Sequence, residues 1–474
     1  MTAEFCEEYV QECGGNQLNN NAVYNNYCAK HTLPDGDAYY AYPFRESDDS
    51  PAAPAFPGVP ISSYPAEVIS VSFDPTRNDK SFWAIGRRGQ IVQIRPNQPQ
   101  GNPTTILDMA SLMISSDNGE DGLLGFAFSP EFATNKFFYV AYTIKVGTCN
   151  PCRYGIQYQM RLGKFKLMTR AIDTKDTLEV LMTTTSDLPK ENGQHFGGWI
   201  GFHPMDYGLG KRYSPLYWAI GDGGPQKDLH QDGQDNSNLW GTIVKIAVPN
   251  GSNGQGYRVP STNPFKGRPQ AGKEEIFAWG LRNPWRCSID RARRGLALYC
   301  GVVGQQNIEW VDKIKRGRNY GWGIYEGSTC FAKNKYGVDC SAPENFPAPA
   351  QYENPWFEYC HLNYNSDDGE GVDPELCPAN GNTIRGQSVI GGVRYRGTRW
   401  SHGLAGKYVF ADYQTKILAF VKFKNGRRVG QVIDENLPRI ISFAEDNNGE
   451  VYMVPFSQRN TALIALTCGS ACPS

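Results

Sequence analysis

One pattern recurs along most of the chain and restricts the folds that it can adopt. An apolar, strand-like run ends in a polar turn and is followed by a second run rich in Tyr, Trp or Phe. Short runs of this kind, separated by Gly, Asn, Asp and Pro, are typical of β-strands joined by tight turns. Beyond Val68 no long run has the 3.6-residue period of a helix, so the chain is predicted to be all-β.

The spacing of the copies indicates how many units the chain contains. The copies align at Phe73, Phe128, Phe202, Ile289 and Phe443, with gaps of 55, 74, 87 and 154 residues. The last gap is wide enough for one further unit, which gives about six units of this kind. Six small antiparallel sheets predict a six-bladed β-propeller, because radial packing leaves only short strand edges exposed. Two β-sandwiches with coincidental turns are the alternative, and strand spacing does not exclude them.

The N-terminal part of the chain has a different composition. Its first 45 residues are polar, rich in Asn and contain three cysteines, and a Pro-rich stretch follows from Pro51 to Pro60. We therefore expect a short cysteine-containing appendage and linker in residues 1–60. The propeller is expected in residues 61–474.

Charge and hydropathy exclude two classes of partner. The chain has 47 Lys and Arg against 48 Asp and Glu, without the basic block that nucleic acid or an anionic membrane requires. No apolar run approaches the roughly 20 residues that span a bilayer. We expect a small-molecule or protein partner, no nucleic acid and no membrane span.

The 13 cysteines bear on the cellular compartment. They fall into local groups: Cys6, Cys13 and Cys28; Cys149 and Cys152; Cys287 and Cys300; Cys330, Cys340, Cys360 and Cys377; Cys468 and Cys472. Disulfides persist in oxidising compartments, so this grouping favours a secreted, extracellular protein. Zinc is the competing interpretation, because the second and last groups have ligand-like spacing, but no matching His or Cys pair follows either of them.

The first residues of the chain do not distinguish a cytosolic from a secreted protein. The segment MTAEFCEEYVQEC has neither the basic residues nor the apolar stretch of a signal peptide. The protein is therefore either cytosolic or secreted with its signal removed, and the cysteines favour removal. The sequon Asn250-Gly-Ser adds slight support for secretion.

Three polar residues stand where glycine or proline shapes the backbone. His195 lies in QHFGG, where two glycines would let a ligand approach the backbone, and an imidazole with a pKa of about 6.5 is a suitable general base. Asp222, in AIGDGG, ends a strand at the expected channel mouth and could bind a sugar hydroxyl or a cation. Arg282, before Asn283 and Pro284, has donors suited to a developing oxyanion. A structural or exposed histidine, a turn aspartate and a structural ion pair are the alternatives.

An oxygen-rich segment indicates a calcium site. Residues 303–307 (VGQQN), followed by Glu309 and Asp312, offer exposed carbonyl and carboxylate oxygens, the ligands that calcium prefers. The spacing is not that of an EF-hand, and a second acidic loop at Ser116–Asp121 is ordinary for a solvated turn. The chain has no Ser-His-Asp order, phosphate-binding loop or nucleotide-binding glycine motif, which argues against serine hydrolysis and nicotinamide chemistry.

Eight segments, taken in order between about residues 60 and 460, carry a resemblance to a known family: GLLGFAFSPEF, HFGGWIGF, YWAIGDGG, GLRNPWRC, VGQQNIEWVDKIKRGRNYGW, SVIGGVRYRG, GKYVFADY and SFAEDNNGEVY. The chain resembles the soluble glucose and aldose sugar dehydrogenases that use pyrroloquinoline quinone. It is even more similar to the hedgehog-interacting-protein-like branch. The resemblance implies a six-bladed propeller in which the quinone lies over the channel on a calcium ion.

The resemblance also implies roles for single residues. His195 matches the general base that takes the proton from the C1 hydroxyl of the sugar. Arg282 matches the arginine that stabilises the reduced carbonyl oxygen, and Asp222 matches the acidic residue beside the substrate. Asn283 and Glu120 match positions that contact the quinone.

Other matched positions would hold the calcium ion and the carboxylates of the quinone. Gly304 and Gln305 fall where two backbone carbonyls bind calcium in the family. Arg439 matches one of the cations that anchor the quinone, and Lys416 is a candidate for a second one.

Departures from the bacterial members weaken the expected binding of quinone. Gln414 stands in place of a lysine, Leu437 in place of an arginine, and Gln194 in place of an acidic residue. Each lost charged hydrogen bond costs about 1.5 to 3 kcal/mol, or roughly tenfold or more in affinity. Insertions around residues 149–193 and 330–377 fall at loop positions, so the identity of the sugar does not follow from the resemblance.

Three functions are compatible with these features. The leading prediction is a secreted, quinone- and calcium-dependent enzyme that oxidises the anomeric carbon of a sugar to a lactone and passes electrons to an external acceptor. The main alternative is a protein-binding propeller of the hedgehog-interacting-protein-like type, in which the N-terminal arm and the inserted loops bind another protein. A calcium-dependent lactone hydrolase is the third possibility, but the motifs do not form a ring of metal-binding carboxylates.

Overall fold

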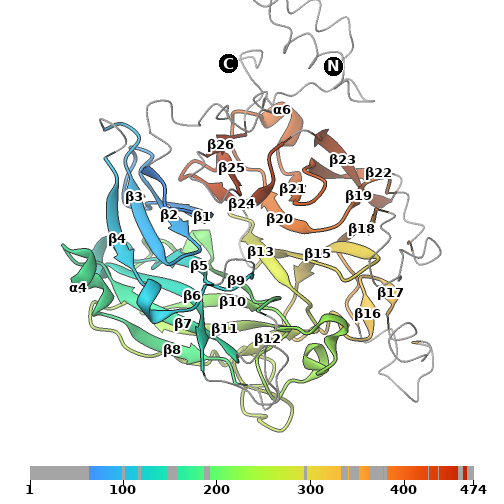
Figure 1. The fold of residues 1–474 in the computed structure, drawn as a ribbon, viewed down its shortest axis with the longest axis horizontal. Helices are drawn as coiled ribbons and strands as arrows, with labels where there is room; N and C mark the ends of the chain where they lie inside the picture. The colour runs from blue at the N-terminus through green and yellow to red at the C-terminus, as the bar shows by residue number, and fades with distance from the viewer. Residues whose placement is uncertain are drawn as a thin grey trace, which may run out of the picture.

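The computed structural model describes most of the chain between residues 63 and 466. The described residues are 63–98, 102–115, 119–146, 157–185, 193–292, 296–331, 340, 352–362, 377, 382–424, 426–435, 437–456 and 463–466. They form short strands with few helical turns, and six small sheets stand in chain order around a central axis (Figure 1). The chain is a six-bladed β-propeller, which confirms the predicted all-β fold class.

The first three blades each have four antiparallel strands in chain order. The first contains β1 (Val68–Phe73), β2 (Phe82–Gly86), β3 (Gln90–Ile94) and β4 (Thr104–Asp108). The second contains β5 (Leu123–Phe128), β6 (Phe137–Lys145), β7 (Tyr158–Lys166) and β8 (Glu179–Thr183). The third contains β9 (Gly197–Phe202), β10 (Tyr213–Ile220), β11 (Thr242–Pro249) and β12 (Ile276–Trp279).

The last three blades are less regular. The fourth contains β13 (Pro284–Ile289), β14 (Leu298–Val302), β15 (Ile308–Ile314), β18 (Phe357–His361) and β19 (Arg385–Gly386), and a hairpin of β16 (Tyr325–Glu326) and β17 (Thr329–Cys330) precedes β18. The fifth contains β20 (Val389–Arg394), β21 (Tyr408–Asp412), β22 (Leu418–Lys424) and β23 (Arg427–Asp434). The sixth contains β24 (Ile440–Glu445), β25 (Val451–Pro455) and β26 (Ile464–Ala465). The α-helices described are α3 (Phe132–Asn135), α4 (Ala171–Lys175) and α6 (Ser401–Leu404).

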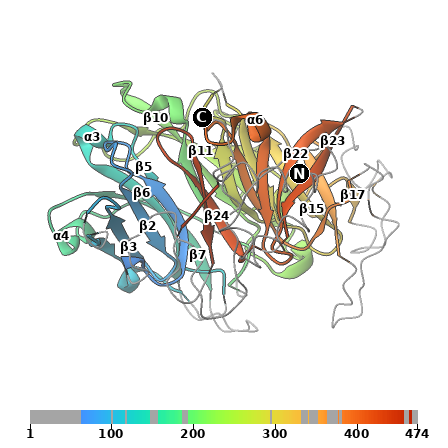
Figure 2. The same cartoon turned by 90° about the horizontal axis from the view of Figure 1, so that it is seen from above.

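The first strand of each blade contributes to a closed inner ring. β1, β5, β9, β13, β20 and β24 contact one another in that order, and β24 contacts β1. Seen from the side, the strands run across the thickness of this ring (Figure 2). The five aligned residues of the sequence repeat all lie on inner strands, and the sixth inner strand, β20, lies in the wide gap before Phe443. The repeat therefore marks the innermost strands, and the predicted count of six units is right.

Aromatic side chains fill the space between neighbouring blades. Trp83 of β2 is fully buried and packs against the rings of Phe126, Phe128 and Phe138 in the second blade, with centroids 4.7 to 5.5 Å apart. Aromatic pairs at such distances add about 0.5 to 1.5 kcal/mol each beyond the area they bury. Aromatic residues of both runs of the repeat therefore join the first blade to the second.

Six cysteines confirm the disulfide interpretation. Cys287 pairs with Cys300 across β13 and β14, Cys330 with Cys340, and Cys360 with Cys377. The remaining cysteines lie outside the described residues, and so do the predicted appendage of residues 1–60 and both candidate zinc pairs. Within the described ranges, no helix is long and apolar enough to cross a membrane.

The sequon is not accessible for modification in this fold. Asn250 is 6% exposed, and its Nδ2 donates hydrogen bonds to the Lys211 carbonyl at 2.7 Å and to Ser214 Oγ at 2.9 Å. Glycosylation would require this same nitrogen to be free at the surface. The slight support that Asn250-Gly-Ser gave to secretion is therefore withdrawn.

Candidate functional site

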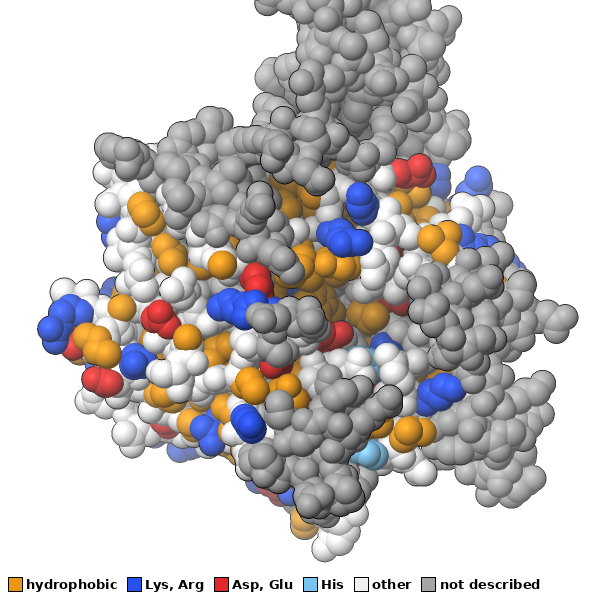
Figure 3. All heavy atoms as spheres, viewed as in Figure 1, with side chains coloured by type: hydrophobic (Ala, Val, Ile, Leu, Met, Phe, Trp, Pro, Cys, Tyr) orange, Lys and Arg blue, Asp and Glu red, His pale blue; other side chains and the backbone are white. Residues whose placement is uncertain are grey.

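Loops that precede the inner strands bring several predicted residues to one end of the channel. Glu120 precedes β5, His195 precedes β9, and Arg282 and Asn283 precede β13. Asp222 follows β10, which is antiparallel to β9, so it reaches the same end. In the view along the axis, charged side chains of both signs lie around the centre of the ring (Figure 3).

A buried histidine and aspartate form the centre of the candidate site. His195 Nδ1 lies 2.8 Å from Asp222 Oδ1, and the two residues are 2% and 1% exposed. Trp322 Nε1 donates to Asp222 Oδ2 at 2.8 Å, and the Gly224 amide donates to Oδ1 at 2.9 Å. Burial alone would raise the pKa of Asp222, but the charge and hydrogen bond of His195, the nearby charge of Arg282 and the Gly224 amide outweigh burial and lower it. An ionised Asp222 therefore accepts the proton on Nδ1 and leaves Nε2 of His195 as the basic nitrogen.

Arg282 is directed at that basic nitrogen. Its Nη2 lies 3.0 Å from His195 Nε2, while Nη1 donates to the Val303 carbonyl at 3.0 Å. Nη2 also lies within hydrogen-bond distance of the side-chain oxygens of Gln226 and Gln305, at 3.0 and 3.2 Å. No ion pair joins Arg282 to a carboxylate among the described residues, which removes the structural ion pair as the alternative explanation for this residue.

Glu120 and Asn283 hold the backbone of the histidine loop. Glu120 Oε2 accepts hydrogen bonds from the His195 amide at 2.7 Å and from Asn283 Nδ2 at 3.2 Å. Asn283 Oδ1 accepts from the Gly197 amide at 3.0 Å. His195 has a φ of 56°, the left-handed region that non-glycine residues rarely adopt, so these contacts stabilise a strained position.

The glycines after His195 are required by close packing against neighbouring strands. A Cβ on Gly198 would lie 2.4 Å from Cβ of Leu124, and a Cβ on Gly197 would lie 3.0 Å from the Pro284 carbonyl oxygen. Both glycines also have positive φ angles of 62° and 94° in chain order. The expectation that these glycines make room for a ligand is therefore wrong. They make room for the neighbouring inner strands of the second and fourth blades.

The loop after β14 is oriented by a carboxylate from the β16–β17 hairpin. Glu326 is fully buried, and its Oε1 accepts the backbone amides of residues 305, 306, 307 and 308 at 2.7, 2.7, 3.0 and 3.3 Å. In a planar trans peptide the carbonyl points away from the amide hydrogen. The carbonyls of Gly304 and Gln305 therefore point away from Glu326, and no hydrogen bond to either oxygen is formed within the described residues.

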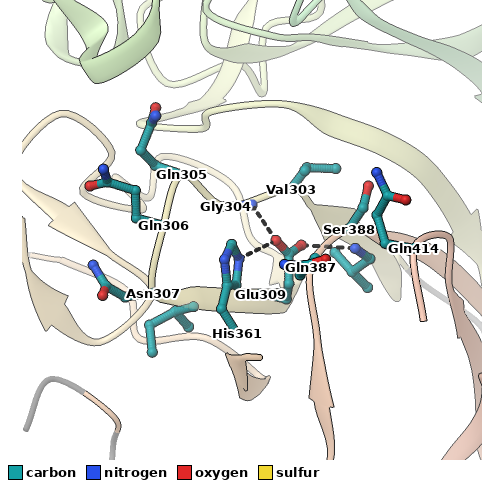
Figure 4. Close-up of polar contacts among 12 residues, drawn as sticks. Val303, Gly304, Gln305, Gln306, Asn307, Glu309, His361, Gln387, Ser388 and Gln414 are labelled. Atoms are coloured by element: carbon teal, nitrogen blue, oxygen red, sulfur yellow. Dashed lines mark hydrogen bonds and ion pairs between the residues drawn. The ribbon is translucent and has the colours of Figure 1, made fainter. Parts of the chain in front are cut away.

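Glu309 supports the same loop from below, together with a histidine (Figure 4). Its Oε1 accepts from the Gly304 amide at 3.2 Å and from His361 Nε2 at 2.6 Å, and its Oε2 accepts from the Val389 amide at 2.8 Å. Burial raises the pKa of Glu309. Burial alone would lower the pKa of His361, but its hydrogen bond and charge interaction with Glu309 raise it. The pair thus links β15, β18 and β20 beneath the loop.

Two carboxylates that the sequence suggested as calcium ligands are not exposed. Glu309 and Asp312 are 0% and 1% exposed. Glu309 is used as described above, and Asp312 Oδ2 accepts from Trp310 Nε1 at 2.9 Å. The described residues contain no group of three or more His, Cys, Asp or Glu side chains placed to hold a metal. In the 303–307 segment the Val303 and Asn307 carbonyls accept hydrogen bonds, so the carbonyls of Gly304 and Gln305 remain as candidate calcium ligands.

The predicted cofactor cations lie apart from the histidine pair. The guanidinium of Arg439 lies 5.3 Å from the ring centroid of Tyr413 and forms no ion pair with a carboxylate in the described part of the chain. Lys416 occupies a left-handed turn position between β21 and β22. Gln414 is exposed, whereas Leu437 is 1% exposed and packs in the core of the fifth and sixth blades. The structure brings neither Arg439 nor Lys416 into contact with His195.

Sequence reasoning missed two residues that position this site. Trp322 ends a segment that carries the family resemblance, RGRNYGW, so a signal for it was present. Glu326 stands in YEGST without a recognisable motif, and its role depends on the fold of the hairpin over the loop.

Comparisons with known proteins agree with this arrangement. Residues 71–368 match the family described as Glucose / Sorbosone dehydrogenase. The HIPL1 protein of Arabidopsis thaliana is 28% identical over 431 residues, which is 77% of this chain and 55% of that protein. The Hedgehog-interacting protein of Mus musculus is 28% identical over 45% of this chain and 30% of its own length. The quinoprotein glucose dehydrogenase B of Acinetobacter calcoaceticus is 26% identical over 52% of this chain and 48% of its own length. The chain thus spans about half the length of the first of these relatives.

Solved structures share the fold at low identity. The soluble aldose sugar dehydrogenase from Escherichia coli, in its apo form, has a TM-score of 0.58 and 17% identity, and covers 84% of this chain and 96% of its own. The PQQ-bound aldose sugar dehydrogenase from Streptomyces coelicolor has a TM-score of 0.53 and 17% identity, and covers 85% and 94%. At this identity the likeness concerns the propeller fold alone.

Proposed function

The chain belongs to the glucose/sorbosone dehydrogenase family, and from this premise we propose that it is a quinoprotein oxidoreductase that oxidises the anomeric carbon of a sugar to a lactone. One observation carries the proposal. A buried, ionised aspartate orients a histidine whose second ring nitrogen, Nε2, faces an arginine that has no carboxylate partner among the described residues. This is the arrangement that a hydroxyl proton acceptor requires.

The roles of the three side chains follow from their contacts. Asp222 holds the proton on Nδ1, so Nε2 of His195 can take the proton of the C1 hydroxyl, and the ionised carboxylate then stabilises the imidazolium. Pyrroloquinoline quinone, when bound, supplies the two-electron acceptor for the hydride from C1. Arg282 provides donors for the oxygen that gains negative charge during this transfer. Loss of one proton and one hydride converts the cyclic hemiacetal to a lactone.

The loop after β14 fits a calcium ion. Gly304 and Gln305 present carbonyl oxygens that no donor occupies within the described residues, and hard oxygen ligands are those that calcium prefers. Arg439 would bind a quinone carboxylate, because it has no carboxylate partner of its own in the described structure. Asn283, Glu120 and Lys416 are proposed as further contacts to the cofactor.

A protein-binding propeller is the second candidate. Gln414 carries no charge and Leu437 is buried in the core, so two of the expected cationic anchors are absent from these positions. One relative is called Hedgehog-interacting protein, which supports binding of another protein. A lactone hydrolase receives no such support. The compartment is proposed to be extracellular on the evidence of the three disulfides, and the electron acceptor to be an external small molecule or redox protein.

A titration separates the first two candidates. The calcium-loaded full chain is titrated with pyrroloquinoline quinone by calorimetry, and dye reduction is then measured with aldoses, uronic acids and oligosaccharides. We expect saturable binding and sugar-dependent reduction. The substitution His195→Ala should lower turnover by roughly a hundredfold or more while leaving quinone affinity nearly unchanged, because it removes only the proton acceptor.

The matched control is His203→Ala, which changes a histidine at the far end of β9. It should leave both turnover and quinone affinity at the wild-type values. Unchanged turnover in His195→Ala would contradict the mechanism. Absence of quinone binding at high micromolar concentration would favour the protein-binding propeller.

A further inference from the structure

A cavity occupies the interior of the ring and is separate from the candidate site. Its volume is about 440 Å³, and residues of all six inner strands line it. None of the residues assigned above to catalysis, cofactor or calcium is part of its lining. The lining continues into turns that follow the inner strands, at Pro75, Pro204 and the exposed Asn447. The candidate site precedes those strands, so the cavity opens at the opposite end of the channel.

Two neighbouring residues of β13 divide the channel between the two sites. Trp285 Nε1 donates to the carbonyl of Ile441 in β24 at 3.1 Å. Arg286 Nη2 donates to the carbonyl of Ile69 in β1 at 3.2 Å, across the ring from β13. These side chains therefore span the channel, and Arg286 forms the inner end of the cavity.

The inner end of the cavity carries a positive charge that the described chain does not neutralise. Arg286 is 5% exposed, and among the described residues its side chain donates only to the carbonyls of Trp285 and Ile69. Its guanidinium also lies 4.4 Å from the ring centroid of Trp285, a contact that stabilises the cation without neutralising it. Its Nε has no hydrogen-bond partner, and it forms no ion pair among the described residues. Burial lowers the pKa of Arg286 to about 9, so the guanidinium is still charged at neutral pH. A buried charge without a counterion is costly, which indicates that the counterion is a ligand.

Two further polar atoms in the lining lack partners. Ser288 is 8% exposed, and its Oγ forms no hydrogen bond with any part of the chain that the structure describes. Glu445 Oε1, nearer the open end, is also without a partner. Burial raises the pKa of Glu445 to about 7, so this group is partly protonated at neutral pH and repels an anion only weakly. The lining also includes Phe126, Phe128 and Phe202 and, towards the open end, the charged residues Arg291 and Asp446.

We propose that this rear cavity is a binding site for a small organic carboxylate with an apolar body. The carboxylate would accept from Arg286 and Ser288, because a guanidinium matches a carboxylate in charge and geometry. The apolar body would lie against the phenylalanine walls, which a purely inorganic anion would leave without contact. A volume of about 440 Å³ is within the range of small-molecule sites. The proposal does not depend on the enzyme function of the opposite face.

Benzoate is the probe that tests the proposal, measured by calorimetry on the full chain. Benzamide has the same shape without the charge. We expect saturable binding of benzoate with one molecule per chain. Benzamide should bind at least about tenfold more weakly, which corresponds to one charge-assisted hydrogen bond. The substitution His195→Ala should leave benzoate affinity unchanged, because His195 does not line the cavity.

The substitution Ser288→Leu tests the location of binding. It replaces a hydroxyl that has no partner among the described residues with a bulkier apolar side chain two positions from Arg286, so it should preserve folding and abolish benzoate binding. Ser288→Ala, the matched control, keeps the space open and should lower affinity only several-fold. Equal affinity of Ser288→Leu and the wild type would overturn the proposal. Equal affinity for benzoate and benzamide, or no saturable binding at about 10 mM, would also overturn it.

Discussion

At the scale of single residues, the candidate site depends on side chains that are buried and fully engaged. His195, Asp222 and Arg282 form a chain of hydrogen bonds that Trp322 completes by donating to the second oxygen of the aspartate. The first three were predicted from the sequence, and the structure brings them into direct contact. An unsatisfied carboxylate oxygen in such a place costs about 1 to 3 kcal/mol, so Trp322 controls how well Asp222 stays ionised.

The substitution Trp322→Phe tests that role. It keeps an aromatic ring against Phe331 but removes the donor to Asp222 Oδ2. We expect kcat in dye reduction to fall by roughly tenfold, with little change in KM, because the imidazolium at His195 loses stabilisation. The pKa of Asp222 should rise, since a hydrogen bond that favours its charged form is lost.

Trp310→Phe is the matched control for that substitution. Trp310 is also buried, and its Nε1 donates to Asp312 at 2.9 Å, away from the candidate site. It should lower stability to a similar extent and leave kcat unchanged. An equal loss of kcat in both variants would show that Trp322 acts on stability alone.

At the scale of elements, the β16–β17 hairpin connects an insertion to the candidate calcium loop. The Cys330–Cys340 disulfide closes the segment just after this hairpin, and Glu326 on β16 accepts four consecutive amides of the loop. The hairpin thus determines the direction of the carbonyls of Gly304 and Gln305. Glu326 has no recognisable sequence motif. It orients the loop because the hairpin lies next to β15.

The substitution Glu326→Gln should weaken calcium binding by about tenfold or more. It removes the negative charge that makes these hydrogen bonds strong, and the loss of one charged hydrogen bond accounts for an effect of this size. Calorimetric titration of the full chain with calcium alone measures the affinity. Glu358→Gln changes a partly buried carboxylate, which binds Ser328 of the same hairpin, and should leave calcium affinity unchanged. Unaltered affinity in Glu326→Gln would refute the positioning role.

At the scale of the whole molecule, stability comes from contacts between blades. Asp290 follows β13 and Arg396 follows β20, and their side chains form two hydrogen bonds of 2.9 and 2.6 Å between the fourth and fifth blades. Burial alone would raise the pKa of Asp290, but the contacts with Arg396 and the Ala292 amide lower it overall. Because the pKa is lower in the folded state, ionisation of Asp290 stabilises the fold above its unfolded pKa of about 3.9.

The substitution Asp290→Asn should therefore destabilise the protein in a pH-dependent way. At pH 7 we expect the free energy of unfolding to fall by about 1.5 to 3 kcal/mol, the usual contribution of a charged hydrogen bond in a partly buried pair. The difference from the wild type should shrink as the pH falls from about 4, the unfolded pKa, through the lower pKa of the folded state, where the native carboxylate becomes protonated. Denaturant unfolding at several pH values measures it, and a difference independent of pH would contradict the assignment.

The sequence by itself predicted the all-β class and the six units, which the structure confirms, and it singled out the histidine, aspartate and arginine that the structure brings together. These features depend on local patterns, because the alternation of a strand and the glycines of a turn are read within a few residues. The cysteine grouping similarly indicated disulfides, three of which are formed.

Only the tertiary structure decided which polar groups are exposed and which are paired. Glu309 and Asp312 looked like cation ligands but are buried, and Asn250 looked accessible but is enclosed. Glu326 and Arg286 acquired their importance from partners far away in the chain, which local patterns do not encode. Burial and long-range hydrogen bonding depend on how the six blades close around the axis, so the fold is needed to assign them.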